Sequence, residues 1–346
     1  LLELESSNFS WDIKEIGLQV AGLMTADMIR RRLKDPLQDY DRILVPGRCR
    51  GDLKKLSTEL GLPIDRGPEE LKDIPRFFNK ESPKMNVSNY DISIFAEIVD
   101  ASKLSVEQII AKAANFKKNG ANVIDIGCLP ETEFPHLEDS VLELKNQGFT
   151  VSVDSLDPSE LIRGSNAGAD YLLSLTPDTL WVVNEVSATP ILIPKEPSNE
   201  KSLFESIEYF LKIDRDFYAD AILDPIPFGL VESICRYQRL RKNYPEIKIM
   251  VGVGNVSELT EADTNGINAI LIGICSELKA SAVLTTQVSG HARRAINEID
   301  VARKVMYAAR ENMALPKGFG DDLLTIHAKR PYLDTYEEIK EISENV

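Results

Sequence analysis

Cysteine and histidine are scarce in this chain of 346 residues, which holds four cysteines and three histidines. The cysteines, Cys49, Cys128, Cys235 and Cys275, are far apart and form no Cys-x-x-Cys pair. This spacing argues against a disulfide framework and against a zinc site, and it fits a reducing cytoplasm. We therefore expect a cytoplasmic protein in which the cysteines are small buried apolar side chains, and we assign no metal-ligating residues.

Long apolar runs and positive charge are also lacking. No apolar run approaches the ~20 residues that cross a bilayer, so we expect no membrane-spanning segment. The chain has 40 basic and 55 acidic residues and a net charge of −15, which argues against nucleic acid and anionic membranes as partners. Its 43% of apolar residues suffice for large cores and argue against disorder.

Eight short apolar segments, each followed by a helix-like stretch, dominate the sequence from Asp91 to Gln287. They are rich in Val, Ile and Leu without strict alternation, which is typical of parallel strands buried on both faces. The pattern predicts a (β/α)8 TIM barrel, with a doubly wound open sheet as the alternative. The predicted strands are residues 92–98, 121–126, 149–153, 169–173, 190–193, 219–223, 247–251 and 281–284. Predicted helices between them include residues 105–118, 202–212, 229–243 and 258–279.

A barrel of about 250 residues leaves both flanks outside it. We predict three parts: residues 1–85 as part of a small α/β domain with a linker, residues 86–315 as the barrel, and residues 316–346 as a C-terminal tail. The first part is expected to contain strands at 15–24 and 42–46 and helices at 26–33 and 51–60, with Thr25 as the cap of the first helix. The polar residues 79–90 read as the linker.

The active site of a TIM barrel lies at the C-terminal ends of its strands. The polar residues that close the predicted strands are Glu97, Asp100, Asp125, Asp154, Ser174, Asp224, Asn255, Thr285 and Gln287. A partly desolvated carboxylate there needs hydrogen-bond donors, which a heterocycle with several N–H groups would supply. For Asp125, Asp154 and Asp224 the alternative is a helix cap or a loop acceptor. Ser257 is expected to cap the helix at 258–279.

Several segments resemble the signature strands of dihydropteroate synthases. They are residues 120–127 (Gly-Ala-Asn-Val-Ile-Asp-Ile-Gly), 151–155, 168–170 and 224–229. Residues 252–257 (Gly-Val-Gly-Asn-Val-Ser) are closer to the pterin-binding domains of corrinoid methyltransferases. With the flanking segments 21–25, 45–52, 73–75, 284–289 and 291–294, the full pattern is similar to the dihydropteroate synthase-related proteins associated with tetrahydromethanopterin.

This resemblance implies that the barrel binds a pterin. Asp154 and Asp224 would hold the ring, and Asn255 would lie near its reactive edge. Asp125 is a third carboxylate candidate. Ser174 falls at or beside the fourth-strand position where the synthases have an asparagine. A Mg²⁺ ion usually assists the synthase reaction and is a candidate cofactor here.

Cationic side chains near the C-terminal end are expected to contact the phosphates of a pterin substrate. They are His291, Arg293 and Arg294, at the start of the last helix. A solvated helix face is the alternative for the two arginines. Arg48 and Arg50 are further candidates for anion binding, with a loop salt bridge as their alternative.

Three departures from the synthase pattern bear on activity. Glu97-Ile98-Val99-Asp100 stands where the family has Asn-x-Thr-x-Asp-Ser-Phe, and the Ser-Arg-Lys of the seventh strand and the Arg-x-His of the eighth are missing. No catalytic residue is therefore assigned.

Three functions stay open. The first is a transferase that joins a dihydropterin methyl diphosphate to an arylamine in folate or tetrahydromethanopterin biosynthesis. The second is a pterin-binding subunit that works with a corrinoid protein, and the third is a non-catalytic pterin-binding protein. We rank the first ahead because the flanking segments match. A homodimer through apolar positions of the helix at 295–313 is also expected, with packing against the barrel wall as the alternative.

Overall fold

The computed structural model describes residues 9–18, 20–34, 36–69, 71–78, 86–320 and 322–324. The chain divides into two compact units, Leu1–Met85 and Asn86–Val346. Most of the predicted linker and most of the predicted C-terminal tail lie outside the described residues. No described helix has both the length and the apolar character that a membrane span requires.

The N-terminal unit is a small α/β segment. Its parallel strands β1 (Ile43–Val45) and β2 (Ile64–Arg66) pair with each other, and α1 (Ala26–Arg32) and α2 (Leu53–Leu60) bury apolar residues with them. The short helices η3 (Leu71–Asp73) and α3 (Ile74–Phe77) follow. Thr25 caps α1, as predicted, because its hydroxyl accepts the backbone N–H of Met28 at 3.3 Å.

The strand predicted at 15–24 is wrong. The chain forms a short 3-10 helix there, η2 (Ala21–Leu23). Val20 and Leu23 are 55% and 60% exposed, so this apolar run is not buried as a strand would be. Strand β2, in contrast, was not predicted, because Ile64–Arg66 holds a single apolar residue.

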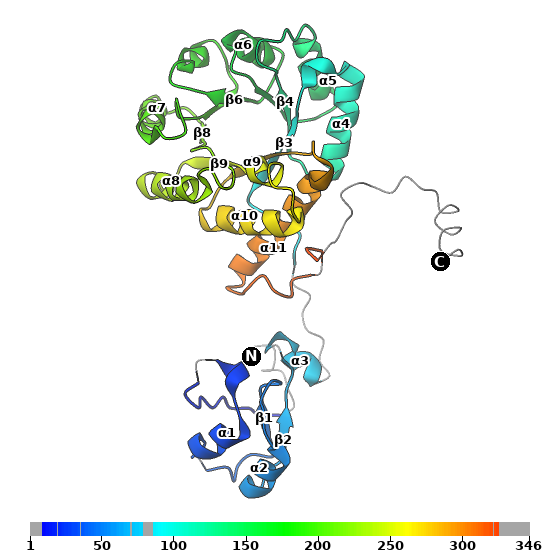
Figure 1. Ribbon diagram of the computed structural model, residues 1–346, viewed down its shortest axis with the longest axis vertical. Helices are drawn as coiled ribbons and strands as arrows, with labels where there is room; N and C mark the ends of the chain where they lie inside the picture. Colours follow the sequence, from blue (N-terminus) through cyan, green and yellow to red (C-terminus); the bar gives the residue numbers. More distant parts are fainter. Residues whose placement is uncertain are drawn as a thin grey trace, which may run out of the picture. The chain divides into compact units, whose positions relative to one another are not determined.

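The C-terminal unit is a closed barrel of eight parallel strands, which confirms the predicted TIM barrel (Figure 1). The last strand pairs with the first, Ala282 opposite Ser93, so the sheet closes and the open-sheet alternative is wrong. The strands are β3 (Ser93–Ile98), β4 (Val123–Gly127), β5 (Val151–Asp154), β6 (Tyr171–Leu175), β7 (Thr189–Leu192), β8 (Tyr218–Ala219), β9 (Lys248–Gly252) and β10 (Ala282–Thr286).

Helices surround this barrel (Figure 1). The α-helices are α4 (Val106–Lys118), α5 (Leu137–Asn146), α6 (Pro158–Asn166), α7 (Glu200–Lys212), α8 (Leu230–Asn243), α9 (Gly254–Ser257), α10 (Thr264–Glu277) and α11 (Ala295–Glu311). Three short 3-10 helices, η4 (Ala101–Lys103), η5 (Leu180–Asn184) and η6 (Gly290–Ala292), lie in the connections after β3, β6 and β10.

The single helix predicted at 258–279 is wrong in its first part, because α9 and α10 are separate. Ser257 is the buried last residue of α9 and does not cap α10. Asp263 caps α10 instead, since its carboxylate accepts the backbone N–H of Asn265 at 3.2 Å.

Strand β8 is much shorter than the predicted strand 219–223. The chain bends at Asp220, whose carboxylate accepts the backbone N–H of Ile222 at 2.7 Å. Ile222 has a φ of +62°, a left-handed conformation that a strand cannot continue. This bend ends the pairing and turns the following residues into the loop that leads to α8.

The apolar positions of α11 that suggested a dimer are buried inside the chain. Ile299, Ala302, Val305 and Ala309 are at most 7% exposed, and Met306 packs against the barrel core. Packing against the barrel wall therefore describes this face of the helix. A homodimer stays a prediction without residues assigned to it.

The barrel interior is layered, and the layering positions the site. Phe95, Tyr171 and Tyr218 meet edge to face inside the barrel, with ring centroids 5.0 to 6.3 Å apart. Because side chains alternate between faces along a strand, residues two positions further on face the same interior. Two residues closer to the C-terminal end of each strand, Glu97 follows Phe95, Asp125 follows Val123 and Asp220 follows Tyr218. The aromatic layer is thus followed by an acidic one.

Candidate functional site

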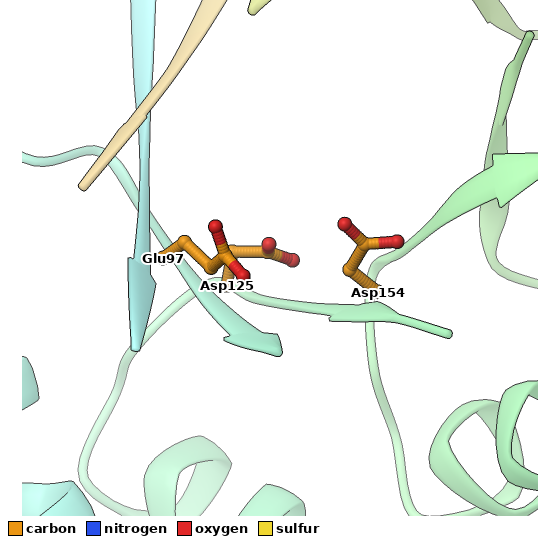
Figure 2. A group of neighbouring side chains, drawn as sticks. All are labelled: Glu97, Asp125 and Asp154. Carbon is orange, nitrogen blue, oxygen red and sulfur yellow. The ribbon is translucent and has the colours of Figure 1, made fainter. Parts of the chain in front are cut away.

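Three carboxylates from neighbouring strands meet at the C-terminal end of the barrel. They are Glu97 of β3, Asp125 of β4 and Asp154 at the end of β5, and one oxygen of each lies within 4.8 Å of the others. Figure 2 shows the three side chains turned toward one another. We call these residues the acidic cluster. They come from positions predicted to close the strands.

Asp125 is the most enclosed member of the acidic cluster. Its side chain is fully buried, and one carboxylate oxygen, Oδ1, accepts the hydroxyl of Ser152 at 2.5 Å. Its other oxygen, Oδ2, is buried and has no hydrogen-bond partner among the described residues. Burial, then the charges of Asp154 and Glu97, raises the pKa of Asp125 well above its ordinary value.

Asp154 is held by Ser174, whose hydroxyl donates to Oδ1 at 2.6 Å. Ser174 has a φ of +68°, and the pairing of β6 with β7 shifts register between Leu172 and Leu175 around it. This irregularity brings the Ser174 side chain to Asp154. Burial raises the pKa of Asp154, while the hydrogen bond from Ser174 opposes the rise.

The carboxylate of Glu97 makes no hydrogen bond or ion pair with another described residue. Burial, followed by the charges of Asp154 and Asp100, raises the pKa of Glu97 to about 7. Gly127 makes room for it, because a Cβ on Gly127 would lie 2.5 Å from the nearer Glu97 oxygen. A cavity of about 200 Å³ adjoins Glu97 at the ends of β3 and β10.

Asp220 is a fourth inward carboxylate, and it is not among the residues predicted from the sequence. It is 8% exposed, and the hydroxyl of Tyr237 donates to its Oδ1. Burial raises the pKa of Asp220 to about 6, and the charge of Asp154 adds to the rise. Its other oxygen points toward Gly252, 3.9 Å from the place of an added Cβ. Alternation from Tyr218 predicts that Asp220 faces inward, but the strand predicted at 219–223 placed the strand-end carboxylate at the residue that follows it, Asp224.

Asp224 is tied to the wall of the barrel. Its carboxylate forms an ion pair with Arg236 of α8 at 2.8 Å, and the Arg236 side chain is only 6% exposed. Arg236 also donates to the carbonyl oxygens of Ala221 and Ile222, so the pair holds the loop after β8. These contacts are those of a loop acceptor, the alternative that the sequence left open.

Asn255 lies on α9, directly after β9. Its Nδ2 donates to the carbonyl oxygen of Leu223 at 2.9 Å, which joins the ends of β8 and β9. At β10, Thr286 rather than Thr285 lies beside the acidic cluster, since its hydroxyl donates to the backbone oxygen of Glu97 at 3.2 Å.

The predicted phosphate-contacting residues lie after β10 and make local contacts. His291 lies 3.2 Å from the carbonyl oxygen of Ser257, Arg293 donates to Gly290, and Arg294 is the N-cap residue of α11.

A carboxylate already accepts hydrogen bonds from the nearby backbone N–H groups. The N–H groups of Val288 and Ser289 both donate to Glu258, each at 2.9 Å. In the N-terminal unit, Arg48 forms an exposed ion pair with Glu69 at 3.0 Å, which is the alternative predicted for it.

Comparison with known proteins supports the fold and leaves the activity open. A family of unknown function (DUF6513) matches residues 1–69. An uncharacterized protein of Methanocaldococcus jannaschii, MJ0107, is 27% identical, with 92% of this chain and 74% of that protein covered.

Solved structures of dihydropteroate synthases are similar to the barrel. The enzyme of Yersinia pestis with a pterine-sulfa conjugate matches with a TM-score of 0.50 and 16% identity, over 66% of this chain and 95% of its own. The enzyme of Xanthomonas albilineans with 7,8-dihydropteroate matches with a TM-score of 0.49 and 16% identity, over 67% and 96%. The chain thus carries a TIM barrel of the form found in dihydropteroate synthases.

Proposed function

We propose that the barrel binds a pterin at its acidic end. The observation that carries this proposal is the pair of inward carboxylates, Asp154 at the end of β5 and Asp220 directly after β8, with β6 and β7 between these strands. The 2-amino group and ring N–H groups of a pterin are donors, and ionised carboxylates are strong acceptors. Ser174 would orient Asp154, and Asn255 and Asp224 would fix the wall on the far side.

We further propose that the bound pterin is a dihydropterin methyl diphosphate and that the chain joins it to an arylamine, in folate or tetrahydromethanopterin biosynthesis. The amine nitrogen would form a bond to the methylene carbon, the bond from that carbon to the diphosphate oxygen would break, and the amine would lose a proton to solvent. Such a displacement depends on positioning and on charge stabilisation of the leaving group. The resemblance in the flanking segments supports this reaction.

The negative charge of the acidic cluster would affect the binding of the diphosphate leaving group. Glu97, Asp125 and Asp154 would repel a diphosphate unless a cation balanced them. The unpartnered Asp125 oxygen and the spacing of the three carboxylate oxygens, within 4.8 Å of one another, fit a Mg²⁺ ion held by these residues. Bound Mg²⁺ would supply positive charge for the leaving diphosphate. His291, Arg293 and Arg294 remain candidates for its outer oxygens.

Calorimetric titration with 6-hydroxymethyl-7,8-dihydropterin tests pterin binding. We expect Asp154→Asn to weaken binding about 10-fold or more, because a hydrogen bond to a charged group is worth about 1.5–3 kcal/mol. Asp216→Asn is the matched control, since Asp216 is 80% exposed and pairs with Lys248 at the N-terminal end of β9. Failure of the folded wild-type protein to bind the compound would refute the proposal.

A second candidate function is supported by Asn255, which lies where the pterin-binding domains of corrinoid methyltransferases have an asparagine near the reactive edge. In that case a methyl group would pass from a methylated pterin to a corrinoid protein supplied as a separate partner. Release of diphosphate with an arylamine would support the first function, and corrinoid-dependent demethylation the second. Pterin binding without either turnover would indicate a non-catalytic binding protein.

We propose that pterin binding belongs to residues 86–315, with residues 1–85 and 316–346 as separate parts. A homodimer in the cytoplasm is the expected form, and sedimentation of the full chain would test it.

A further inference from the structure

We propose that Glu97, Asp125 and Asp154 form a binding site for one divalent cation that prefers oxygen ligands, such as Mg²⁺ or Mn²⁺. The site rests on the placement of these side chains. Only the binding of a substrate diphosphate to this cation rests on the proposed function.

Sheet register brings the three side chains together. Glu97 of β3 is opposite Asp125 of β4, and Asp125 is opposite Ser152 of β5, so Asp154 stands two residues further along the neighbouring strand. Their oxygens lie within 4.8 Å of one another. Metal–oxygen distances of about 2.0–2.6 Å separate two ligands of one ion by up to about 4–5 Å. The three oxygens can therefore share an ion with little movement.

An unsatisfied oxygen points to a ligand in this cluster. Asp125 is completely buried, and its Oδ2 has no hydrogen-bond partner among the described residues. A buried polar atom without a partner is costly and is uncommon in folded proteins. The serine hydroxyls of Ser152 and Ser174 serve only one oxygen each, on Asp125 and Asp154. A bound cation would satisfy the remaining oxygen.

Charge balance leads to the same conclusion. Glu97, Asp125 and Asp154 form no ion pair with a lysine or arginine among the described residues. Three ionised carboxylates so close together repel one another strongly in a partly desolvated site. Gly127 leaves room for the Glu97 carboxylate to join the other two, because an added Cβ would lie 2.5 Å from its nearer oxygen. A bound cation would offset this repulsion.

The ligand atoms define the kind of cation. All three are carboxylate oxygens, and no described histidine or cysteine belongs to the group. Oxygen ligands favour Mg²⁺, Mn²⁺ and Ca²⁺ over the softer metals that sulfur and imidazole select. Three protein ligands leave other coordination positions to water or to a substrate.

Binding of Mn²⁺ alone to the full-length protein, stripped of metal with a chelator, tests the site. Loss of the free Mn²⁺ signal in electron paramagnetic resonance should show one ion per chain, displaced by excess Mg²⁺. We expect Asp125→Asn and Glu97→Gln each to weaken Mn²⁺ binding about 10-fold or more, a loss of roughly 1.4 kcal/mol. Asp216→Asn, which removes an exposed carboxylate far from the cluster in sequence, should bind as the wild type does.

Circular dichroism checks that each variant is folded. Glu97→Gln guards against a folding defect in Asp125→Asn, because the carboxylate of Glu97 makes no hydrogen bond with another described residue. The proposal is overturned if the wild type shows no saturable Mn²⁺ binding below about 1 mM, the weak end of protein cation sites. It is also overturned if both folded variants bind Mn²⁺ as tightly as the wild type.

On the proposed function, the open coordination positions would face the diphosphate of the substrate. The Mn²⁺ titration contains no pterin, whereas the titration with 6-hydroxymethyl-7,8-dihydropterin can be run in chelator, since that compound has no diphosphate. Failure of the cation site and failure of the pterin site are therefore observed separately.

Discussion

At the scale of single residues, the site is defined by which carboxylate oxygens have partners. Asp125, Asp154 and Asp220 each accept a side-chain hydroxyl on one oxygen. The other oxygen of Asp125 has no hydrogen-bond partner among the described residues. A carboxylate held in this way keeps its orientation while leaving acceptor capacity for a ligand. The bound hydroxyls therefore position the site without filling it.

Asp220 should make the stability of the protein depend on pH. Its pKa in the folded protein is raised to about 6 by burial, above the ordinary value of 3.8. The unfolded chain therefore loses this proton first, and the stability that Asp220 provides below pH 4 is lost as the pH rises through 6. The difference amounts to about 2–3 kcal/mol. In Asp220→Asn this part of the pH dependence should be absent.

Urea unfolding at pH 4 and pH 7, in chelator, measures this effect. The variant should gain stability relative to the wild type between the two values. Its amide oxygen can still accept from Tyr237 and Ile222, so the fold around it is retained. Asp216→Asn controls for the change in net charge. An unchanged difference between Asp220→Asn and the wild type at the two pH values would contradict the prediction.

At the scale of elements, the sequence predicted the barrel strands well and their ends less well. Seven of the eight predicted strands both begin and end within about two residues of the observed ones, because buried parallel strands are continuous apolar runs. Strand β8 departs most, since the bend at Asp220 depends on a side-chain hydrogen bond that hydrophobicity does not encode. The division of 258–279 into α9 and α10 was missed for a similar reason. The cap at Asp263 depends on local backbone geometry.

The site could be predicted in part. The C-terminal strand ends supplied Glu97, Asp125, Asp154 and Ser174, which the structure brings together. Their mutual distances follow from sheet register, which a single sequence does not reveal. The ion pair of Asp224 with Arg236 could not be predicted in this way. It joins a loop to helix α8, and the pattern of apolar strands does not indicate which helix residue contacts a loop.

The start of α10 offers a test at this scale. Asp263→Ala should lower the free energy of unfolding by about 1 kcal/mol, because the backbone N–H of Asn265 loses its acceptor. Asp263→Asn should restore most of the loss, since asparagine is also a good cap. Urea unfolding of the three proteins measures the effect. Equal stability of Asp263→Ala and the wild type would show that Asp263 does not stabilise the helix.

At the scale of the whole barrel, Arg303 of α11 connects the last helix to the beginning of the first two strands. Its side chain is 2% exposed and donates to the carbonyl oxygens of Ile92, before β3, and Gly120, before β4. It also pairs with Asp300 at 2.6 Å and lies over the ring of Tyr90. The last helix of the barrel is thereby joined to the first strands. The contacts lie at the end of the barrel opposite the acidic cluster.

Arg303→Leu should destabilise the barrel by about 3–5 kcal/mol, the usual cost of removing one partner of a buried ion pair. Lys195→Met removes an exposed partner, from a pair in which Lys195 and Asp178 are 54% and 65% exposed, and should destabilise the protein far less, because solvent screens such a pair. Chemical unfolding of both variants provides the comparison. Similar small losses in the two would mean that Arg303 does not stabilise the barrel.

The contact of Glu258 with the amides of Val288 and Ser289 has a consequence for any anion that approaches the end of β10. This carboxylate belongs to the same chain, so it competes with an anion for the two amides at every ligand concentration. A phosphate group would have to displace it before it could use those two N–H groups. A ligand anchored elsewhere in the barrel would displace Glu258 more readily than a free anion, because its phosphate would also be held close to the two amides.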